Sequence, residues 1–162
     1  MWRLLVCVGL LLSALPTDAT KTGVANIRTP WADVRRIERR MERLGVRVVW
    51  KRLNSGICAR RGLLGVYKPD QQTVFMCQQS IRSSSEPLLD TLRHEGWHAV
   101  QQICNNGRAV LSKSKIFSVL TESDKRNLKE FYDRSQYPLE AEARAIEKNS
   151  TYEYLRGINL YC

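Results

Sequence analysis

The chain of 162 residues is long enough for one domain, and its charged (26%) and hydrophobic (43%) fractions are ordinary for a globular protein. No apolar stretch reaches the roughly 18 uninterrupted residues that a membrane-spanning helix needs. The net charge of +10 favours anionic partners, meaning acidic substrates, an anionic envelope surface or nucleic acid. Because no stretch interleaves aromatic and basic residues, the sequence argues against a specific nucleic-acid partner.

The start of the chain differs in character from the rest. One basic residue, Arg3, precedes an apolar run over residues 4–15, and small residues surround Ala19. This order is typical of a secretory signal peptide, although a buried N-terminal helix is the alternative. We therefore predict a signal peptide at residues 1–19, a single mature domain at 20–162, and a secreted or periplasmic location.

The first predicted helix runs from Pro30, capped by Thr29, to a stop at Gly45. Its apolar residues recur at the spacing of one helical face, and five arginines occupy much of the other side. We interpret the arginines as a solvated face, with a specific anion site as the alternative. The apolar set is Trp31, Val34, Ile37, Met41 and Leu44, and the basic set is Arg35, Arg36, Arg39, Arg40 and Arg43.

Three short segments rich in β-forming residues follow this helix. A turn centred on Pro69 and Asp70 joins the second and third, and it would place Gly62 opposite Cys77. The predicted strands span residues 46–52, 62–67 and 73–79.

The second half of the chain is predicted to be helical. Leu89, Leu92, Gly96, Ala99 and Ile103 recur at helical spacing and mark the buried side of the first of these helices. The predicted helices span residues 86–104, 121–134 (with Thr121 and Asp124 as a capping box) and 139–148, while residues 107–120 are assigned to no element.

Cleavage of the signal peptide would remove Cys7 and leave four cysteines. In an exported chain four cysteines indicate two disulfides, with three ways to pair them. Since Cys58 and Cys77 flank the predicted turn, we favour that pair, with Cys104 bonded to Cys162.

Within the helix at 86–104 lies the motif His94-Glu95-Gly96-Trp97-His98. Two histidines four residues apart lie on one helical face, so both imidazoles can reach one metal ion. Glu95 lies beside that face, where a general base for a metal-bound water belongs. His94 and His98 are the only histidines of the chain, and two structural histidines are the alternative interpretation.

A zinc enzyme needs a third protein ligand, and the motif resembles that of the zincin metallopeptidases with a glutamate third ligand, the gluzincins. In that family the glutamate opens a downstream helix, with a small residue three positions later and an acid four positions later. Glu140 and Ala143 match the first part, whereas Arg144 occupies the acid position. The resemblance implies Glu140 as the ligand, with Glu142 as the fallback. The residue that orients a histidine must then come from elsewhere, such as a backbone carbonyl, Asp90 or Glu142.

The resemblance also implies further site features. The strand before the metal helix, residues 73–79 here, would pair with an extended substrate. A group that stabilises the oxyanion is also needed, and Tyr137 is the first candidate, with Tyr132 and Arg144 as competitors.

The sequence thus predicts an α+β, zincin-like domain, with a small twisted sheet packed on a metal-binding helix and an added N-terminal helix. It would be a secreted, monomeric zinc metallopeptidase that binds one zinc ion through His94, His98 and Glu140 and uses Glu95 as the base. Its substrate would be a peptide or protein, with an acidic one favoured by the charge.

Three alternatives stay open. The chain could be a non-catalytic, zinc-stabilised basic module that binds an anionic envelope component or partner. It could also be a zinc amidase acting on cell-wall material, or a metal-free binding protein held by its disulfides.

Overall fold

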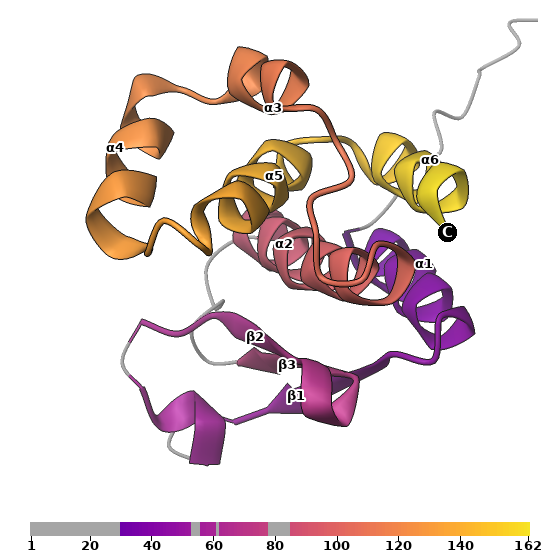
Figure 1. Ribbon diagram of the computed structural model, residues 1–162. Coiled ribbons are helices and arrows are strands. Elements are labelled where there is room, and N and C mark those ends of the chain that lie inside the picture. Colours follow the sequence, from indigo (N-terminus) through magenta and orange to yellow (C-terminus); the bar gives the residue numbers. More distant parts are fainter. Residues whose placement is uncertain (1–29, 53–55, 61, 78–84) are drawn as a thin grey trace, which may run out of the picture.

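The computed structural model describes residues 30–52, 56–60, 62–77 and 85–162, so the predicted signal peptide and Cys7 lie outside the described residues. The helix α2 (Ser85–Cys104) lies at the centre of the fold (Figure 1). It packs on the three-stranded sheet through β2 and β3, and it also contacts α1 (Pro30–Arg43), α5 (Tyr137–Glu147) and α6 (Thr151–Tyr161). The α+β prediction and the packing of the sheet on the motif helix are confirmed.

The sheet is mixed, with the order β1-β3-β2. The central strand β3 (Thr73–Cys77) runs parallel to β1 (Arg47–Lys51) and antiparallel to β2 (Gly65–Lys68). Both sides of β3 are therefore paired, and the prediction that this segment offers a free edge to a substrate is wrong. The strand that borders the metal helix with an unpaired edge is β2.

The turn between β2 and β3 is centred one residue later than the sequence predicted. Four residues connect the strands, three of them in a short 3-10 helix (Pro69–Gln71), and Gln72 adopts a left-handed conformation with φ of 45°. The centre lies between Asp70 and Gln71, which moves the register by two positions, so Leu64, rather than Gly62, accepts the backbone hydrogen bond of Cys77 at 2.9 Å. Because the shift is even, each side chain keeps its predicted face of the sheet.

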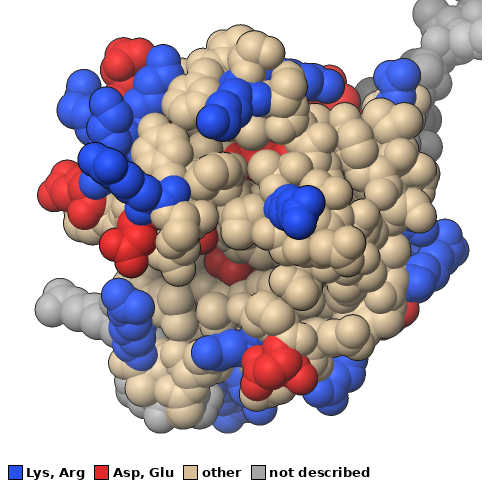
Figure 2. Space-filling model, in the orientation of Figure 1, with Lys and Arg blue, Asp and Glu red and all other residues tan. Residues whose placement is uncertain are grey.

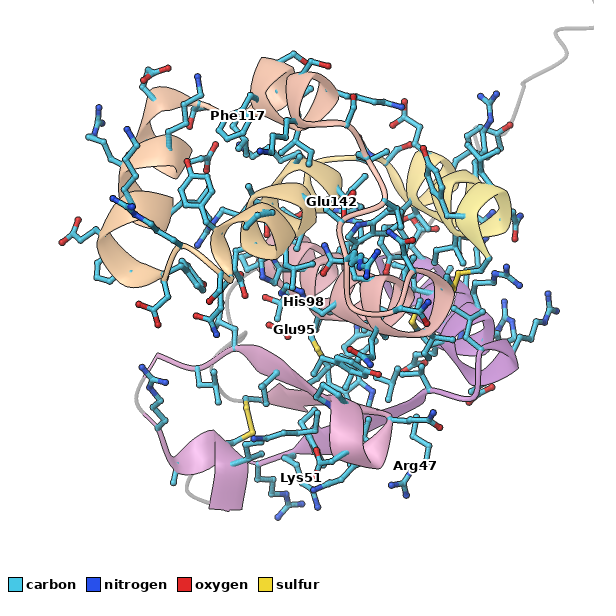
Figure 3. All side chains as sticks on the ribbon, in the orientation of Figure 1. Arg47, Lys51, Glu95, His98, Phe117 and Glu142 are labelled. Carbon is cyan, nitrogen blue, oxygen red and sulfur yellow. A yellow bond between two sulfur atoms is a disulfide. The ribbon has the colours of Figure 1, made fainter. Side chains whose placement is uncertain are left out.

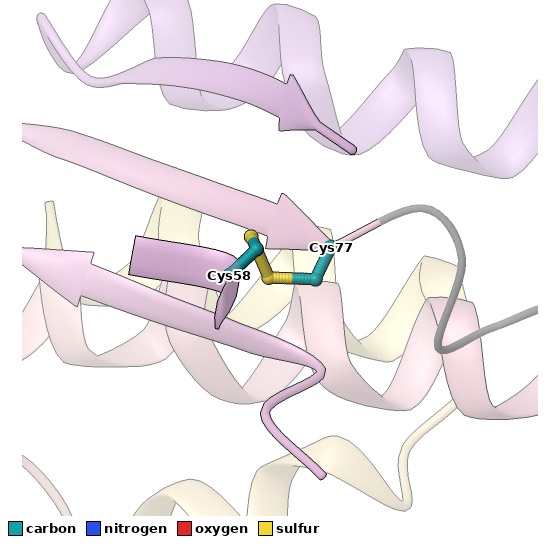
Figure 4. The surroundings of a disulfide bond; sticks show 2 residues. All are labelled: Cys58 and Cys77. Atoms are coloured by element: carbon teal, nitrogen blue, oxygen red, sulfur yellow. A yellow bond between two sulfur atoms is a disulfide. The ribbon is translucent and has the colours of Figure 1, made fainter. Parts of the chain in front are cut away.

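Both predicted disulfides are confirmed. Cys58 bonds to Cys77 across a Cα–Cα distance of 5.7 Å, and Cys104 bonds to Cys162 across 5.2 Å. Cys58 comes from a 3-10 helix (Gly56–Ala59) beside the end of β3, so its pairing does not need a place opposite Cys77 in the hairpin (Figure 4). The second disulfide fastens the end of α6 to the end of α2.

The helices follow their sequence signals with two additions. The capping box of Thr121 and Asp124 is confirmed and opens α4 (Glu122–Phe131), which ends three residues before the predicted Arg134. The unassigned segment 107–120 contains α3 (Lys113–Val119), and the C-terminal segment, for which no helix was predicted, forms α6 behind a second capping box of Ser150 and Glu153. No helix in the described part of the chain is long and apolar enough to cross a membrane.

The main core surrounds α2 and takes in residues of α1, α5, α6 and the sheet. Trp97 and Tyr154 are fully buried there, with ring centroids 5.9 Å apart. Gly96 allows this packing, because a Cβ at that position would lie only 2.5 Å from the Tyr154 hydroxyl oxygen. The histidine motif of α2 is thus held from behind by an aromatic core.

We predict that Gly96→Ala lowers the free energy of unfolding by about 1–3 kcal/mol in urea denaturation, because the new methyl group overpacks the contact with Tyr154. Gly157→Ala is the matched control, since its Cβ would lie 3.4 Å from Trp97, an ordinary contact, and alanine favours a helix. Adding Tyr154→Phe to Gly96→Ala should recover stability. A Gly96→Ala variant as stable as the parent would contradict this account.

Candidate metal centre

The two histidines of α2 and the first-turn glutamate of α5 meet in space. The Nε2 atoms of His94 and His98 lie 3.2 Å apart. Oε2 of Glu140 lies 3.3 Å from Nε2 of His94, and Oε1 lies 3.4 Å from Nε2 of His98. Pro138 in the first turn of α5 starts that helix, which directs Glu140 at α2. These three residues could therefore hold a metal ion together.

His94 is held by a carboxylate that the sequence did not single out. Its Nδ1 lies 2.8 Å from Oε2 of Glu147, and the other oxygen of Glu147 lies 3.8 Å from the guanidinium of Arg144. Arg144, which occupies the position where the resemblance expects an acid, therefore lies beside Glu147. Glu147, one helical turn further along α5, is the carboxylate that contacts and orients His94. Asp90, which the sequence suggested as one of the groups that could orient a histidine, pairs with Arg93 instead.

His98 is held by an amide. Its Nδ1 lies 2.9 Å from Oε1 of Gln101, whose Nε2 donates to the backbone oxygen of Leu139 at 3.0 Å and to Glu142 at 2.7 Å. Because the Gln101 oxygen can only accept, Nδ1 of His98 donates to it, and the other ring nitrogen, Nε2, is directed at Glu140.

The fallback ligand Glu142 is directed away from the site. It is completely buried, and Oε1 accepts hydrogen bonds from the backbone N–H groups of Val110, at 2.8 Å, and Leu111. Figure 3 labels Glu142 apart from Glu95 and His98, and the amide of Gln101 lies between Glu142 and His98. Glu142 therefore holds the segment after α2 in place and does not compete with Glu140 as a ligand.

The electrostatics of the site favour a cation. Burial acts to lower the pKa of His94, but the interactions with Glu140 and Glu147 prevail and raise it to about 10. Burial likewise acts to raise the pKa of Glu140, but the two histidines hold it at about 2. Two carboxylates thus stabilise positive charge at His94, and a metal ion that binds there must displace a proton.

Glu95 lies beside this cluster without joining it. Its Oε2 accepts a hydrogen bond of 2.8 Å from the backbone N–H of Tyr67 in β2, while Oε1 accepts none from the described residues. Gly65 allows the close approach, because a Cβ there would lie 2.7 Å from the Thr91 methyl group and 3.1 Å from Cγ of Glu95. The strand β2 therefore fixes the position of the Glu95 carboxylate.

Two hollows open onto the site, one of about 390 Å³ and one of about 410 Å³. Figure 2 shows acidic side chains at the bottom of a recess whose rim is mostly uncharged. The hollows share their residues near the motif, so they form one groove that passes the metal cluster on both sides. The shared residues are Leu63, Gly65, His94, Glu95 and Tyr132.

The structure does not bring Tyr137 to this groove. Its ring stacks on Phe117 of α3, with centroids 6.1 Å apart. Tyr132, the second candidate from the sequence, lines both hollows instead. Burial and the negative charge of Glu140 raise the pKa of Tyr132, so its hydroxyl keeps its proton at neutral pH.

Sequence reasoning missed two residues of the site, Glu147 and Gln101. Glu147 lies seven positions after Glu140 and Gln101 lies three after His98, spacings that return to the same side of a helix. The sequence contains both spacings, but they identify Glu147 and Gln101 as site residues only when it is known that α5 packs on α2.

Comparisons of the chain with protein-family models, with curated proteins and with solved structures found no match.

We predict that Glu147→Ala weakens zinc binding by about 10–100-fold, because the imidazole of His94 loses the group that fixes its orientation and tautomer. Competition with a chromogenic chelator measures the affinity. Glu147→Gln should keep part of it, since the amide oxygen can still accept from Nδ1. Glu130→Ala, on the exposed side of α4, is the control, and equal affinities in all four proteins would contradict the assigned role.

Proposed function

We propose that this protein is a secreted zinc metallopeptidase in which His94, His98 and Glu140 bind the metal and Glu95 is the general base. The observation that carries the proposal is the convergence of the three donor groups, whose atoms lie 3.2–3.4 Å apart, beside Glu95. The resemblance to the gluzincins supports the same assignment.

The spacing supports zinc as the metal. Zinc binds histidine nitrogen and carboxylate oxygen at about 2.0–2.1 Å, and the edges of a tetrahedron of that size are about 3.3–3.4 Å long. Oε2 of Glu140 is buried without a hydrogen-bond donor of good geometry, which a metal ion would compensate. Three protein ligands leave one tetrahedral position open, as in catalytic rather than structural zinc sites.

Zinc bound there would supply a Lewis acid and lower the pKa of a bound water toward about 7. Oε1 of Glu95 takes the proton of the attacking water and passes it to the amine nitrogen that leaves the cleaved peptide bond. The hydrogen bond from Tyr67 keeps the carboxylate in the position that this transfer requires.

The groove suits an extended peptide. Backbone groups alternate in direction along an antiparallel strand, so Gly65 and Tyr67 of β2 direct theirs away from β3. The Tyr67 N–H is bonded to Glu95, which leaves the N–H and C=O of Gly65 and the C=O of Tyr67 for a substrate. A substrate can add to this edge by strand pairing, with one part in each hollow. In this proposal β2, rather than the expected residues 73–79, pairs with the extended substrate.

Tyr132 is the candidate for stabilising the oxyanion. It lines both hollows next to Glu140 and Arg144, and its hydroxyl remains a donor at neutral pH.

The test uses the oxidised mature chain, residues 20–162, loaded with zinc. We expect about one zinc per chain by elemental analysis, and hydrolysis of quenched fluorescent peptides that is abolished by a chelator. Glu95→Gln should keep the zinc and lose about 10²–10⁴-fold in kcat/KM, because only the proton transfer is removed.

His98→Ala, which should lose both zinc and activity, separates metal binding from catalysis. A parent protein that binds zinc but cleaves no peptide, whatever residue stands at position 95, would support the non-catalytic module instead. A folded chain that takes up no zinc would falsify the whole assignment.

A further inference from the structure

Another hollow, lined mainly by basic side chains, lies on a different part of the molecule, between α1 and α6. Its volume is about 230 Å³, and four of its six lining residues are arginines of α1. Figure 1 shows these two helices next to each other, away from the groove at β2. The lining consists of Arg36, Arg39, Arg40 and Arg43 with Leu155 and Asn159 of α6.

These arginines share one side of α1, because they are spaced three, four and seven residues apart. Like charges at these spacings each destabilise a helix by about 0.2–0.5 kcal/mol. Among the described residues no acidic side chain lines the hollow, and Arg36 is the member that pairs with an acidic neighbour, Asp33 at 3.4 Å. The concentration of positive charge is therefore not compensated within the hollow.

The side chain of Arg40 supplies a second observation. Its Nε is buried and has no hydrogen-bond partner among the described residues. The cost of this unpartnered N–H adds to the repulsion among the four arginines, and an anion in the hollow would offset their positive charge. The N–H groups of arginine match the oxygen atoms of a phosphate group, and such charge-assisted hydrogen bonds are stronger than neutral ones.

We propose that the hollow between α1 and α6 binds a phosphate group. Its volume is below the ~300–1,000 Å³ of pockets that enclose a whole small molecule, so it suits the terminal phosphate of a larger ligand. Asn159 adds an amide at the wall, and Leu155 provides an apolar side. Either a phospholipid headgroup or a soluble phosphate ester carries the required group.

The experiment titrates inorganic phosphate into the folded, zinc-loaded mature chain by calorimetry at low ionic strength. The test variant is Arg39→Gln with Arg43→Gln, since both side chains are exposed and the fold should tolerate the change. The control is Arg126→Gln with Arg156→Gln, which removes the same charge from exposed positions outside the hollow. We expect the test variant to bind phosphate at least about tenfold more weakly, and the control to bind within about threefold of the parent.

Cosedimentation with vesicles distinguishes the two sources of phosphate. Binding to phosphatidylglycerol vesicles, but not phosphatidylcholine vesicles, that depends on Arg39 and Arg43 identifies a lipid headgroup. Phosphate binding without such vesicle binding identifies a soluble ester. An equal loss of phosphate affinity in both double variants would show a general charge effect and overturn the proposal. Binding of poly-glutamate, an anion without phosphate, in the absence of phosphate binding would overturn it as well. Peptide hydrolysis should be unchanged in both variants, so this test does not depend on the metal site.

Discussion

The buried carboxylate of Glu142 connects the two helices that build the candidate metal centre. A buried charge is stable only when its hydrogen bonds are satisfied. Glu142 satisfies this condition with the side chain of Gln101 in α2 and two backbone N–H groups after α2. These bonds fix how α5 lies along α2. Because Glu140 and Glu147 lie on α5, the same bonds determine where both carboxylates meet the histidines.

The sequence was sufficient for local features of this fold and site. The spacing of His94 and His98 places them together on any helix, and Thr121 with Asp124 specifies a helix start through contacts that span three residues. Glu140 could be named because zinc chemistry demanded a third ligand and the resemblance indicated where to look. In each case the information lies within one element or in the chemistry of the ligands.

The features that could not be predicted depend on how elements meet. The register of β2 on β3 follows from a turn centred between Asp70 and Gln71, one residue later than Pro69 and Asp70 indicate. The central place of β3 follows from its parallel pairing with β1, which no local pattern encodes. Likewise, Tyr132 and Tyr137 are five residues apart, and only the packing of α3 on α5 shows that Tyr137 is occupied with Phe117.

The acidic side chains of the site lie below the surface of the molecule, and most basic side chains lie on it. Carboxylates that meet the metal cluster are largely covered, with side-chain exposures of 16% for Glu140 and 18% for Glu147, whereas most of the basic excess is on the surface. The exterior is therefore positive, whereas the floor of the groove attracts cations. The two properties do not conflict because they occupy different layers of the molecule.

The disulfide from Cys104 to Cys162 encloses a covalent ring of the chain with a sequence separation of 58. The ring begins at the end of the helix that carries both histidines, and it contains α3, α4, α5 and α6, and therefore Glu140 and Glu147. Even when the chain is unfolded, the oxidised ring keeps the third ligand tethered near the first two, a constraint worth about 4 kcal/mol in the chain-entropy model. Oxidation would thus raise the local concentration of carboxylate around the histidines before any metal arrives, so export and disulfide formation would prepare the chain for loading.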